Sequence, residues 1–122
     1  MEIKFEDIVK GLVKPGQDII DSLTPSKANS LHMAVGISGE AGELLDAIKK
    51  AVIYNKELDR ENVIEELGDL EFYMEGLRAE LGITREQTIE ANMKKLLTGE
   101  KARYKLGMYT DTQAIQRADK EE

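Results

Sequence analysis

The sequence contains no cysteine, no tryptophan and a single histidine. The absence of cysteine excludes a disulfide framework, a thiolate nucleophile and a cysteine-ligated zinc site. One histidine excludes a His-rich metal site. The chain also lacks the roughly 18 continuous apolar residues of a membrane span, and its acidic N-terminus does not have the basic-then-apolar order of a secretory signal. We therefore expect a cytoplasmic protein with no membrane partner.

The chain has 122 residues and a formal net charge of −7. This length predicts a single domain over residues 1–122, small enough to benefit from an oligomer interface. The negative charge argues against a nucleic-acid partner, because binding to the phosphate backbone depends on excess Lys and Arg. Segment 94–105 is basic in contrast, and it is interpreted either as a solvated face or as an anion-binding segment.

Apolar spacing and capping signals predict helices throughout. A short helix is expected over residues 5–13, and residues 1–24 form an N-terminal helix and linker. Thr24-Pro25 predicts the start of a long helix reaching about residue 53. Asp59 predicts the N-cap of a second long helix, which Gly82 ends.

Two capping boxes predict the remaining helices. Thr84 with Gln87 begins a helix through about Leu97, which completes the core helices of residues 25–97. Thr110 repeats the signal in segment 98–122, which combines basic residues with a short final helix. No alternating strand pattern competes with this interpretation. The predicted fold class is all-α, an antiparallel helical bundle of four to five helices.

Each long helix has an apolar stripe that we expect to face the core. The stripe of the first comprises Ala34, Ile37, Ala41, Leu44, Leu45, Ile48 and Val52. The stripe of the second comprises Val63, Leu67, Leu70, Met74, Leu77 and Leu81.

Two pairs of carboxylates lie on these helices, Glu40-Ala-Gly-Glu43 and Glu66-Leu-Gly-Asp69. A three-residue spacing places both members of a pair on neighbouring positions of one helical face. At 100° per residue, Glu66 lies about 60° from the centre of its stripe, so we expect it to be partly buried. Glu43 lies about 160° from its own stripe and should be the most exposed of the four.

Glycines accompany the acids, and each costs a helix roughly 1 kcal/mol relative to alanine. Gly36, Gly39 and Gly42 recur at every third residue, and Gly68 lies inside the second acidic motif. Two interpretations remain open. The missing side chains could let a phosphate or a second helix approach the backbone, or they could serve helix packing alone.

Four ionised carboxylates gathered at partly buried positions repel one another and require a cation. Oxygen ligands select hard cations, and Mg²⁺ suits the set better than zinc or calcium, with Mn²⁺ as an alternative. A triphosphate substrate would add negative charge, so we expect two or more metal ions when it is bound. A free carboxylate could then deprotonate a water that attacks phosphorus, with pyrophosphate as the leaving group.

These residues lead to a known family. Segments 36–50 and 63–70, with Asn92-Met-Lys-Lys-Leu downstream, resemble MazG-like all-α nucleoside triphosphate pyrophosphohydrolases of the small bacterial and phage type. The resemblance covers roughly residues 25–105 and implies conversion of a nucleoside triphosphate and water to the monophosphate and pyrophosphate. It implies Mg²⁺ binding by the acids Glu40, Glu43, Glu66 and Asp69. It also implies nucleotide contacts from Asn92 and Lys95, and Arg103-Tyr104 resembles an Arg-Tyr pair of the family.

Two further residues are site candidates of lower rank. Glu65 is a possible neighbour of the metal site or a catalytic base. His32 shares a helical face with Gly36 and Glu40, so it could line a base pocket or serve as a packing histidine.

Two alternatives to this function remain. One is a related all-α hydrolase acting on dUTP, phosphoribosyl-ATP or an alarmone. The other is a non-catalytic helical dimer with surface acids. A di-iron bundle is excluded because the sequence has no Glu-x-x-His pair. Apolar residues on several faces predict a homodimer, and the resemblance also allows a homotetramer.

Overall fold

The computed structural model describes residues 2–97, 104 and 110–116 of the chain. Over these residues it contains only α-helices, which confirms the predicted all-α class. The helices are α1 (Phe5–Leu12), α2 (Gly16–Ser22), α3 (Pro25–Val52), α4 (Arg60–Leu81), α5 (Arg85–Leu97) and α6 (Asp111–Gln116). A search of the described residues finds no helix that is long and apolar enough to cross a membrane.

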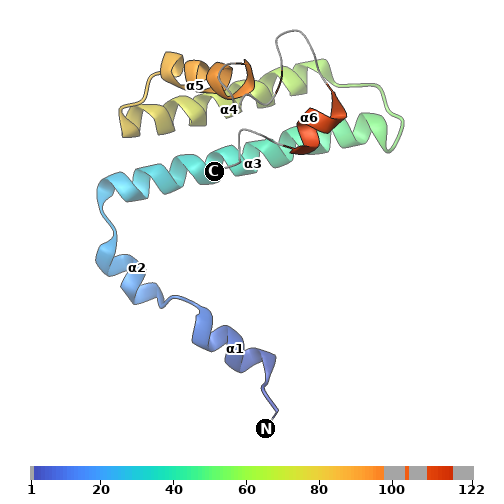
Figure 1. The fold of residues 1–122 in the computed structure, drawn as a ribbon. Coiled ribbons are helices and arrows are strands. Elements are labelled where there is room, and N and C mark those ends of the chain that lie inside the picture. Colours follow the sequence, from blue (N-terminus) through green and yellow to red (C-terminus); the bar gives the residue numbers. More distant parts are fainter. Residues whose placement is uncertain (1, 98–103, 105–109, 117–122) are drawn as a thin grey trace.

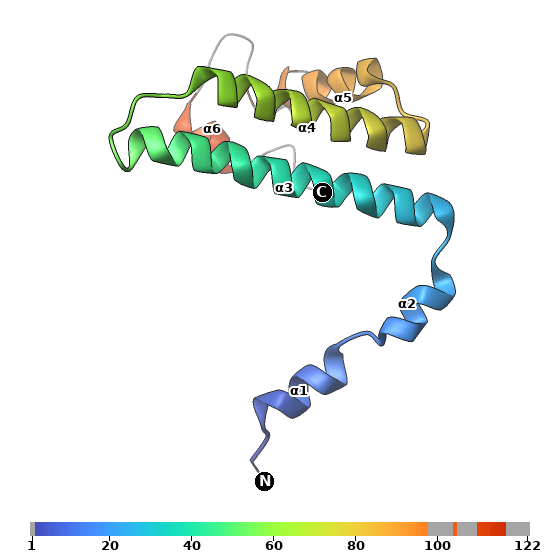
Figure 2. The same ribbon diagram turned by 180° about the vertical axis from the view of Figure 1, so that it is seen from behind.

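The centre of the fold is the antiparallel hairpin of α3 and α4, the one extensive helix pair among the described residues (Figure 1). Both views draw α5 over the same stretch as α4, on the side away from α3 (Figure 2), but among the described residues α5 makes no extensive contact with α4. Helices α1 and α2 leave the N-terminal end of α3 and point away from the hairpin in both views. The hairpin is therefore the only part of the described chain in which two long helices are packed side by side.

The predicted helix ends agree with the structure because the signals are local. The Thr24 side chain accepts a hydrogen bond from the Lys27 amide, and Asp59 caps α4 through the Asn62 amide at 3.1 Å. Gly82 ends α4 with a left-handed φ of 68°, which glycine adopts without the steric cost of a Cβ.

The two remaining capping signals are also present. Thr84 and Gln87 exchange both hydrogen bonds of a capping box, at 2.8 and 3.1 Å. The Gln113 amide donates to the Thr110 hydroxyl at the start of α6. Helix α2 lies in the segment that the sequence analysis expected to be a linker, and with it the described residues form six helices.

The face of α3 that packs on α4 differs from the predicted one. The residues turned away from solvent lie at three- and four-residue steps: Met33, Ile37, Glu40, Leu44, Ala47 and Ala51. The centre of this seam lies about 75° around the helix from the centre of the predicted stripe, and Ile37 and Leu44 belong to both. Leu45 and Val52 are accordingly 68% and 70% exposed. The prediction that the whole stripe faces the core is wrong, because α3 has two apolar faces and α4 covers only one.

Two glycines allow α3 and α4 to pack closely. A Cβ on Gly36 of α3 would run into the ring of Tyr73 on α4, and a Cβ on Gly76 of α4 would meet the sulfur of Met33 on α3. Each helix thus offers a glycine to a large side chain of the other. Neither Gly42 nor Gly68 has any atom within 4 Å of the position of a Cβ, so among the described residues no second helix approaches them.

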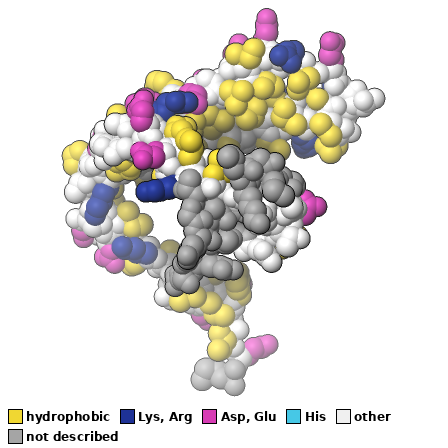
Figure 3. Space-filling model, turned by 45° about the horizontal axis from the view of Figure 1, so that its top comes forward, with side chains coloured by type: hydrophobic (Ala, Val, Ile, Leu, Met, Phe, Trp, Pro, Cys, Tyr) yellow, Lys and Arg dark blue, Asp and Glu magenta, His cyan; other side chains and the backbone are white. Residues whose placement is uncertain are grey.

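The described chain buries very little of itself. Ala47 and Glu66 are its only buried residues, and many large apolar side chains are exposed. Figure 3 shows hydrophobic side chains uncovered over much of the visible face. A folded domain normally gains most of its stability from apolar burial, so the described residues of a single chain do not form an adequate core.

Candidate metal centre

Three acids meet where α3 faces α4. Glu40, Glu43 and Glu66 each bring one carboxylate oxygen into a group whose members all lie within 4.8 Å of one another. Glu40 lies in the seam and is half-buried, Glu43 is exposed one turn further along α3, and Glu66 is only 8% exposed. The burial of Glu66 agrees with its predicted helical phase. The two acidic motifs are therefore brought together by the hairpin.

The environment of Glu66 opposes its negative charge. A hydrogen bond with the Glu40 carboxyl, burial, and the charge of Glu43 together raise the pKa of Glu66 from 4.5 to about 7. At neutral pH the group is thus poised between its protonated and ionised forms. A cation at this position would replace the proton as the source of positive charge.

The three acids have unused ligand capacity. Glu40 Oε2 and Glu66 Oε2 are shielded from solvent and have no hydrogen-bond partner among the described residues. Unpaired buried polar atoms are costly, and such atoms in a native structure often mark an ion or a functional group that binds there. The donor set is made only of carboxylate oxygens, which hard divalent cations prefer. The residues therefore fit a divalent metal ion held by Glu40, Glu43 and Glu66.

A polar depression of about 420 Å³ opens beside the acids. Glu43 and Glu66 line it together with Gly39, Gly42, Asp46 and Asn62. No atom lies within 4 Å of where a Cβ of Gly39 or Gly42 would be, so these glycines leave the wall free of side chains. The depression can therefore admit a ligand group directly against the backbone of α3.

The sequence interpretation did not include Asp46 and Asn62 in the site. Asp46 forms an ion pair with Lys50 at 3.1 Å. Asp46 and Asn62 nevertheless line the depression. Their positions relative to the motifs, three residues after Glu43 and four before Glu66, are the signal that could have identified them.

The profile of the MazG nucleotide pyrophosphohydrolase domain matches residues 28–103. The chain belongs to this family. The match begins in the first turn of α3 and spans α4 and α5, so it includes both acidic motifs. No curated protein and no solved structure matches the chain. Membership makes the protein a nucleotide pyrophosphohydrolase by family, a class of hydrolase that typically uses a divalent metal.

The two other acids of the predicted site lie outside the group of three. Asp69 follows Glu66 on α4 of the MazG domain but is exposed, and its carboxylate is not among the clustered oxygens. Glu65 is likewise exposed and separate from the group. The structure thus brings together three of the five predicted acids, and the metal-binding roles of Asp69 and Glu65 stay predictions.

The predicted nucleotide contacts lie on or near α5. Asn92 is exposed on this helix, and Lys95 is half-buried one turn later. Tyr104 is half-buried, and its amide donates to the Leu96 carbonyl at 2.8 Å, which fixes its backbone against the end of α5. Arg103 lies outside the described residues. Asn92, Lys95 and Tyr104 do not line the depression beside the acids. Their contacts with substrate therefore stay predictions of the MazG resemblance.

His32 lies two turns before Glu40 on α3 and is exposed. Its ring centroid is 6.3 Å from that of Tyr73, the aromatic that packs over Gly36. The histidine therefore borders the hairpin seam and does not line the depression next to the acids. Its role in binding a base stays a prediction.

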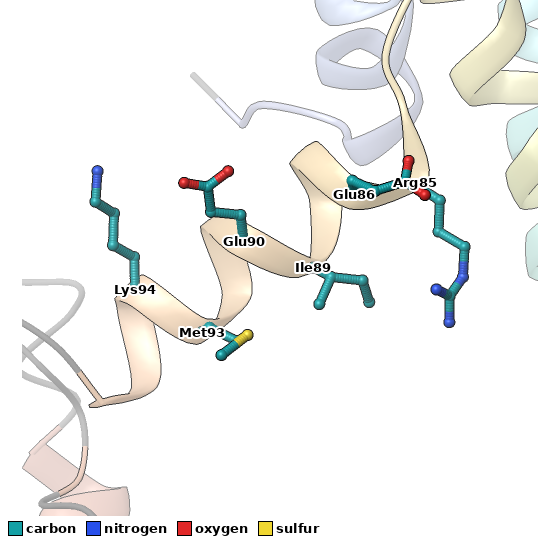
Figure 4. Close-up of a pocket in the computed structure, with 6 residues that line it drawn as sticks. All are labelled: Arg85, Glu86, Ile89, Glu90, Met93 and Lys94. Atoms are coloured by element: carbon teal, nitrogen blue, oxygen red, sulfur yellow. The ribbon is translucent and has the colours of Figure 1, made fainter.

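A second hollow, of about 640 Å³, follows the exposed side of α5 in the MazG domain and is mainly apolar. Figure 4 shows Ile89 and Met93 pointing to one side of the helix, while Glu90 and Lys94 point to the other. No carboxylate cluster adjoins it among the described residues. Its chemistry does not resemble that of a metal site.

Proposed function

We propose that the protein is a Mg²⁺-dependent pyrophosphohydrolase of nucleoside or deoxynucleoside triphosphates. In this reaction a water oxygen bonds to the α-phosphorus, and the bond from that phosphorus to the bridging oxygen breaks. The products are the nucleoside monophosphate and pyrophosphate, and the water gives up its protons. The observation that carries the proposal is the convergence of Glu40, Glu43 and Glu66 within 4.8 Å, inside a chain of the MazG family.

The chain's own residues would divide the work in the following way. Glu40, Glu43 and Glu66 hold the divalent ion, and Asp69 or Glu65 adds an oxygen ligand or accepts a proton. The bound ion supplies positive charge that stabilises the leaving pyrophosphate. Gly39 and Gly42 leave room for a phosphate group beside the acids, in support of a polyphosphate ligand.

The acids cannot neutralise a triphosphate by themselves, because both carry negative charge. Lys95 and Arg103 are the proposed counter-charges. Asn92 and Tyr104 are proposed as further nucleotide contacts, and His32 as a wall of the base pocket. The basic balance of segment 94–105 supports this assignment. Mg²⁺ and these basic side chains together would then balance the negative charge of the carboxylates and the substrate.

The active form is proposed to be a homodimer or a homotetramer. The exposed stripe of α3 supports this, because Ala34, Ala41, Leu45, Ile48 and Val52 share one face that α4 does not cover. An apolar stripe of this length is unfavourable in water. A second copy of the hairpin would cover it and complete a bundle of four long helices.

The deciding experiment is a panel of ribo- and deoxyribonucleoside triphosphates with Mg²⁺, in which pyrophosphate and orthophosphate are measured separately. We expect pyrophosphate and the monophosphate in equal amounts. Release of orthophosphate alone would overturn the proposed reaction. A panel without any turnover, extended to dUTP, phosphoribosyl-ATP and an alarmone, would favour the non-catalytic dimer instead.

A further inference from the structure

Residues 2–23, here called the N-terminal arm, consist of two helices that are too short to be stable alone. Helix α1 has eight residues and α2 has seven. Isolated helices shorter than about 12–15 residues are marginal in water, because nucleation is costly and few hydrogen bonds offset it. Neither helix packs extensively on another described element. Their helical state therefore calls for a surface that the described residues do not provide.

One face of the arm is apolar and exposed to solvent. Phe5, Ile8, Val9 and Leu12 lie within about 100° of one another around α1. Phe5 is 72% and Leu12 is 82% exposed. Ile20 and Leu23 continue the exposed apolar residues into α2 and its C-cap. Lys10 lies on the opposite, polar face of α1.

The total surface indicates how much must be covered. The chain exposes 10258 Å², whereas a compact monomer of its 13.7 kDa mass would expose roughly 6,600 Å². The excess is roughly 3,700 Å² per chain, and obligate homodimers bury roughly 2,000–5,000 Å² in total. For two chains the excess is roughly 7,400 Å², which is more than an interface of this class typically removes, so a second copy can cover a large part of the excess but not all of it. The hairpin of each copy exposes an apolar stripe of its own.

A lipid surface suits the arm less well than a protein does. The arm has five acidic residues, Glu2, Glu6, Asp7, Asp18 and Asp21, and only three basic ones, Lys4, Lys10 and Lys14. Helices that lie on membranes carry mainly Lys and Arg on their polar face, which attract anionic lipid. The net negative charge of the arm would be repelled by such a surface.

We propose that the N-terminal arm crosses to a second copy of this chain and packs its apolar face on the α3–α4 hairpin of that copy. The arm precedes the segment that matches the MazG domain, residues 28–103. The arm therefore lies outside the residues that the family match covers. The proposal is independent of the proposed reaction, because it depends only on the surface of the arm and of the hairpin.

The test is photo-crosslinking of the full-length protein with p-benzoylphenylalanine in place of Phe5. We expect a covalent product of twice the monomer mass on a denaturing gel, with the link mapped by mass spectrometry to residues 25–81 of the second copy. The same amino acid in place of Lys10 is the matched control on the polar face, and it should give little of this product. A link within one chain, a link to another arm, or no link would overturn the proposal.

A second measurement uses Leu12→Asn with Lys10→Asn as its control. Because Leu12 is 82% exposed in the single chain, its substitution should change nothing if the arm is free. If a second copy buries it, the dimer dissociation constant should rise about tenfold or more. Light scattering over a dilution series measures this shift. An unchanged constant, or arm-dependent sedimentation with anionic vesicles in place of dimer formation, would contradict the proposal.

Discussion

Glu40 and Glu66 are neighbours across the α3–α4 seam, and each has one solvent-shielded carboxylate oxygen without a hydrogen-bond partner among the described residues. In most hairpins these seam positions would be apolar, because they are removed from water. Two acids at these positions lower the stability of the metal-free fold, because their carboxylates repel each other. A cation bound between them would replace this repulsion with attraction. Changes at either residue should therefore alter both stability and metal binding.

Replacement of Glu66 tests the pair directly. We expect Glu66→Gln to abolish hydrolysis and metal response while the metal-free protein stays as stable as wild type or becomes more stable, because a like-charge contact is removed. Thermal melting in EDTA and pyrophosphate release measure the two effects. The exposed Glu61 on the same helix, changed to Gln, is the control and should keep activity. A clearly less stable Glu66→Gln protein would indicate a structural ion pair.

The stability of the metal-free protein should depend on pH through Glu66. Its pKa is raised from 4.5 to about 7 in the fold, so between these values the folded chain holds a proton that the unfolded chain has lost. The free energy of unfolding therefore falls as pH rises through this window, and the stabilisation is fully present only below 4.5. Urea midpoints at about pH 5 and about pH 8 measure the fall. Glu66→Gln should show a smaller difference between the two pH values.

Divalent metal should reverse this loss. Mg²⁺ binds the folded arrangement of Glu40, Glu43 and Glu66, so millimolar Mg²⁺ should raise the melting temperature of the wild-type protein. Its apparent affinity should increase as pH rises toward about 7, because the ion competes with the proton on Glu66. Calorimetric titration at several pH values measures both. The absence of any shift at millimolar Mg²⁺ would count heavily against the metal centre.

Two glycines of the hairpin should respond oppositely to alanine. At Gly36 a methyl group would collide with the Tyr73 ring, so Gly36→Ala should lower stability by about 1–3 kcal/mol. At Gly68 the same methyl meets open space, so Gly68→Ala should raise stability by up to about 1 kcal/mol through helix propensity. Urea unfolding compares the two. A loss at Gly68 as large as that at Gly36 would show that another subunit fills the space.

The exposed stripe of α3 gives a test of the oligomer. In a single chain Leu45 is 68% exposed, and substitutions at such positions usually change stability by no more than about 0.5 kcal/mol. In the proposed dimer it is buried, so Leu45→Lys should dissociate the protein and lower its melting temperature. Light scattering and melting at several concentrations measure this. A monomeric wild type at all concentrations would rule out the oligomer.

Helix ends were predictable because their causes are local. Thr24, Asp59, Gly82 and Thr84 each act within a few residues of themselves, and each does so in the structure. The partial burial of Glu66 was predictable too, since helical phase alone places it near the apolar side of α4.

The packing face of α3 was not predictable in this way. The helix has two apolar faces, and a helical wheel does not show which one α4 covers. The choice depends on contacts such as Tyr73 over Gly36, which join residues far apart in the sequence. Asn62 and Asp46 were omitted for a different reason, because their helical spacing from Glu66 and Glu43 was not used to extend the site. Helix α2 was missed because its seven residues give too short a period to recognise and its N-cap, Pro15, makes no side-chain capping hydrogen bond that would mark the start.

The reciprocal glycine contacts fix the register of α3 against α4. Met33 of α3 contacts Gly76 of α4, and Gly36, three residues later on α3, contacts Tyr73, three residues earlier on α4. Because the helices are antiparallel, a further seven residues along α3 and seven back along α4 bring Glu43 opposite Glu66. A slip of one helical turn would move these acids about 5 Å past each other. Substitutions at Gly36 or Gly76 should therefore lower activity from two turns away, although neither glycine lines the depression beside the acids.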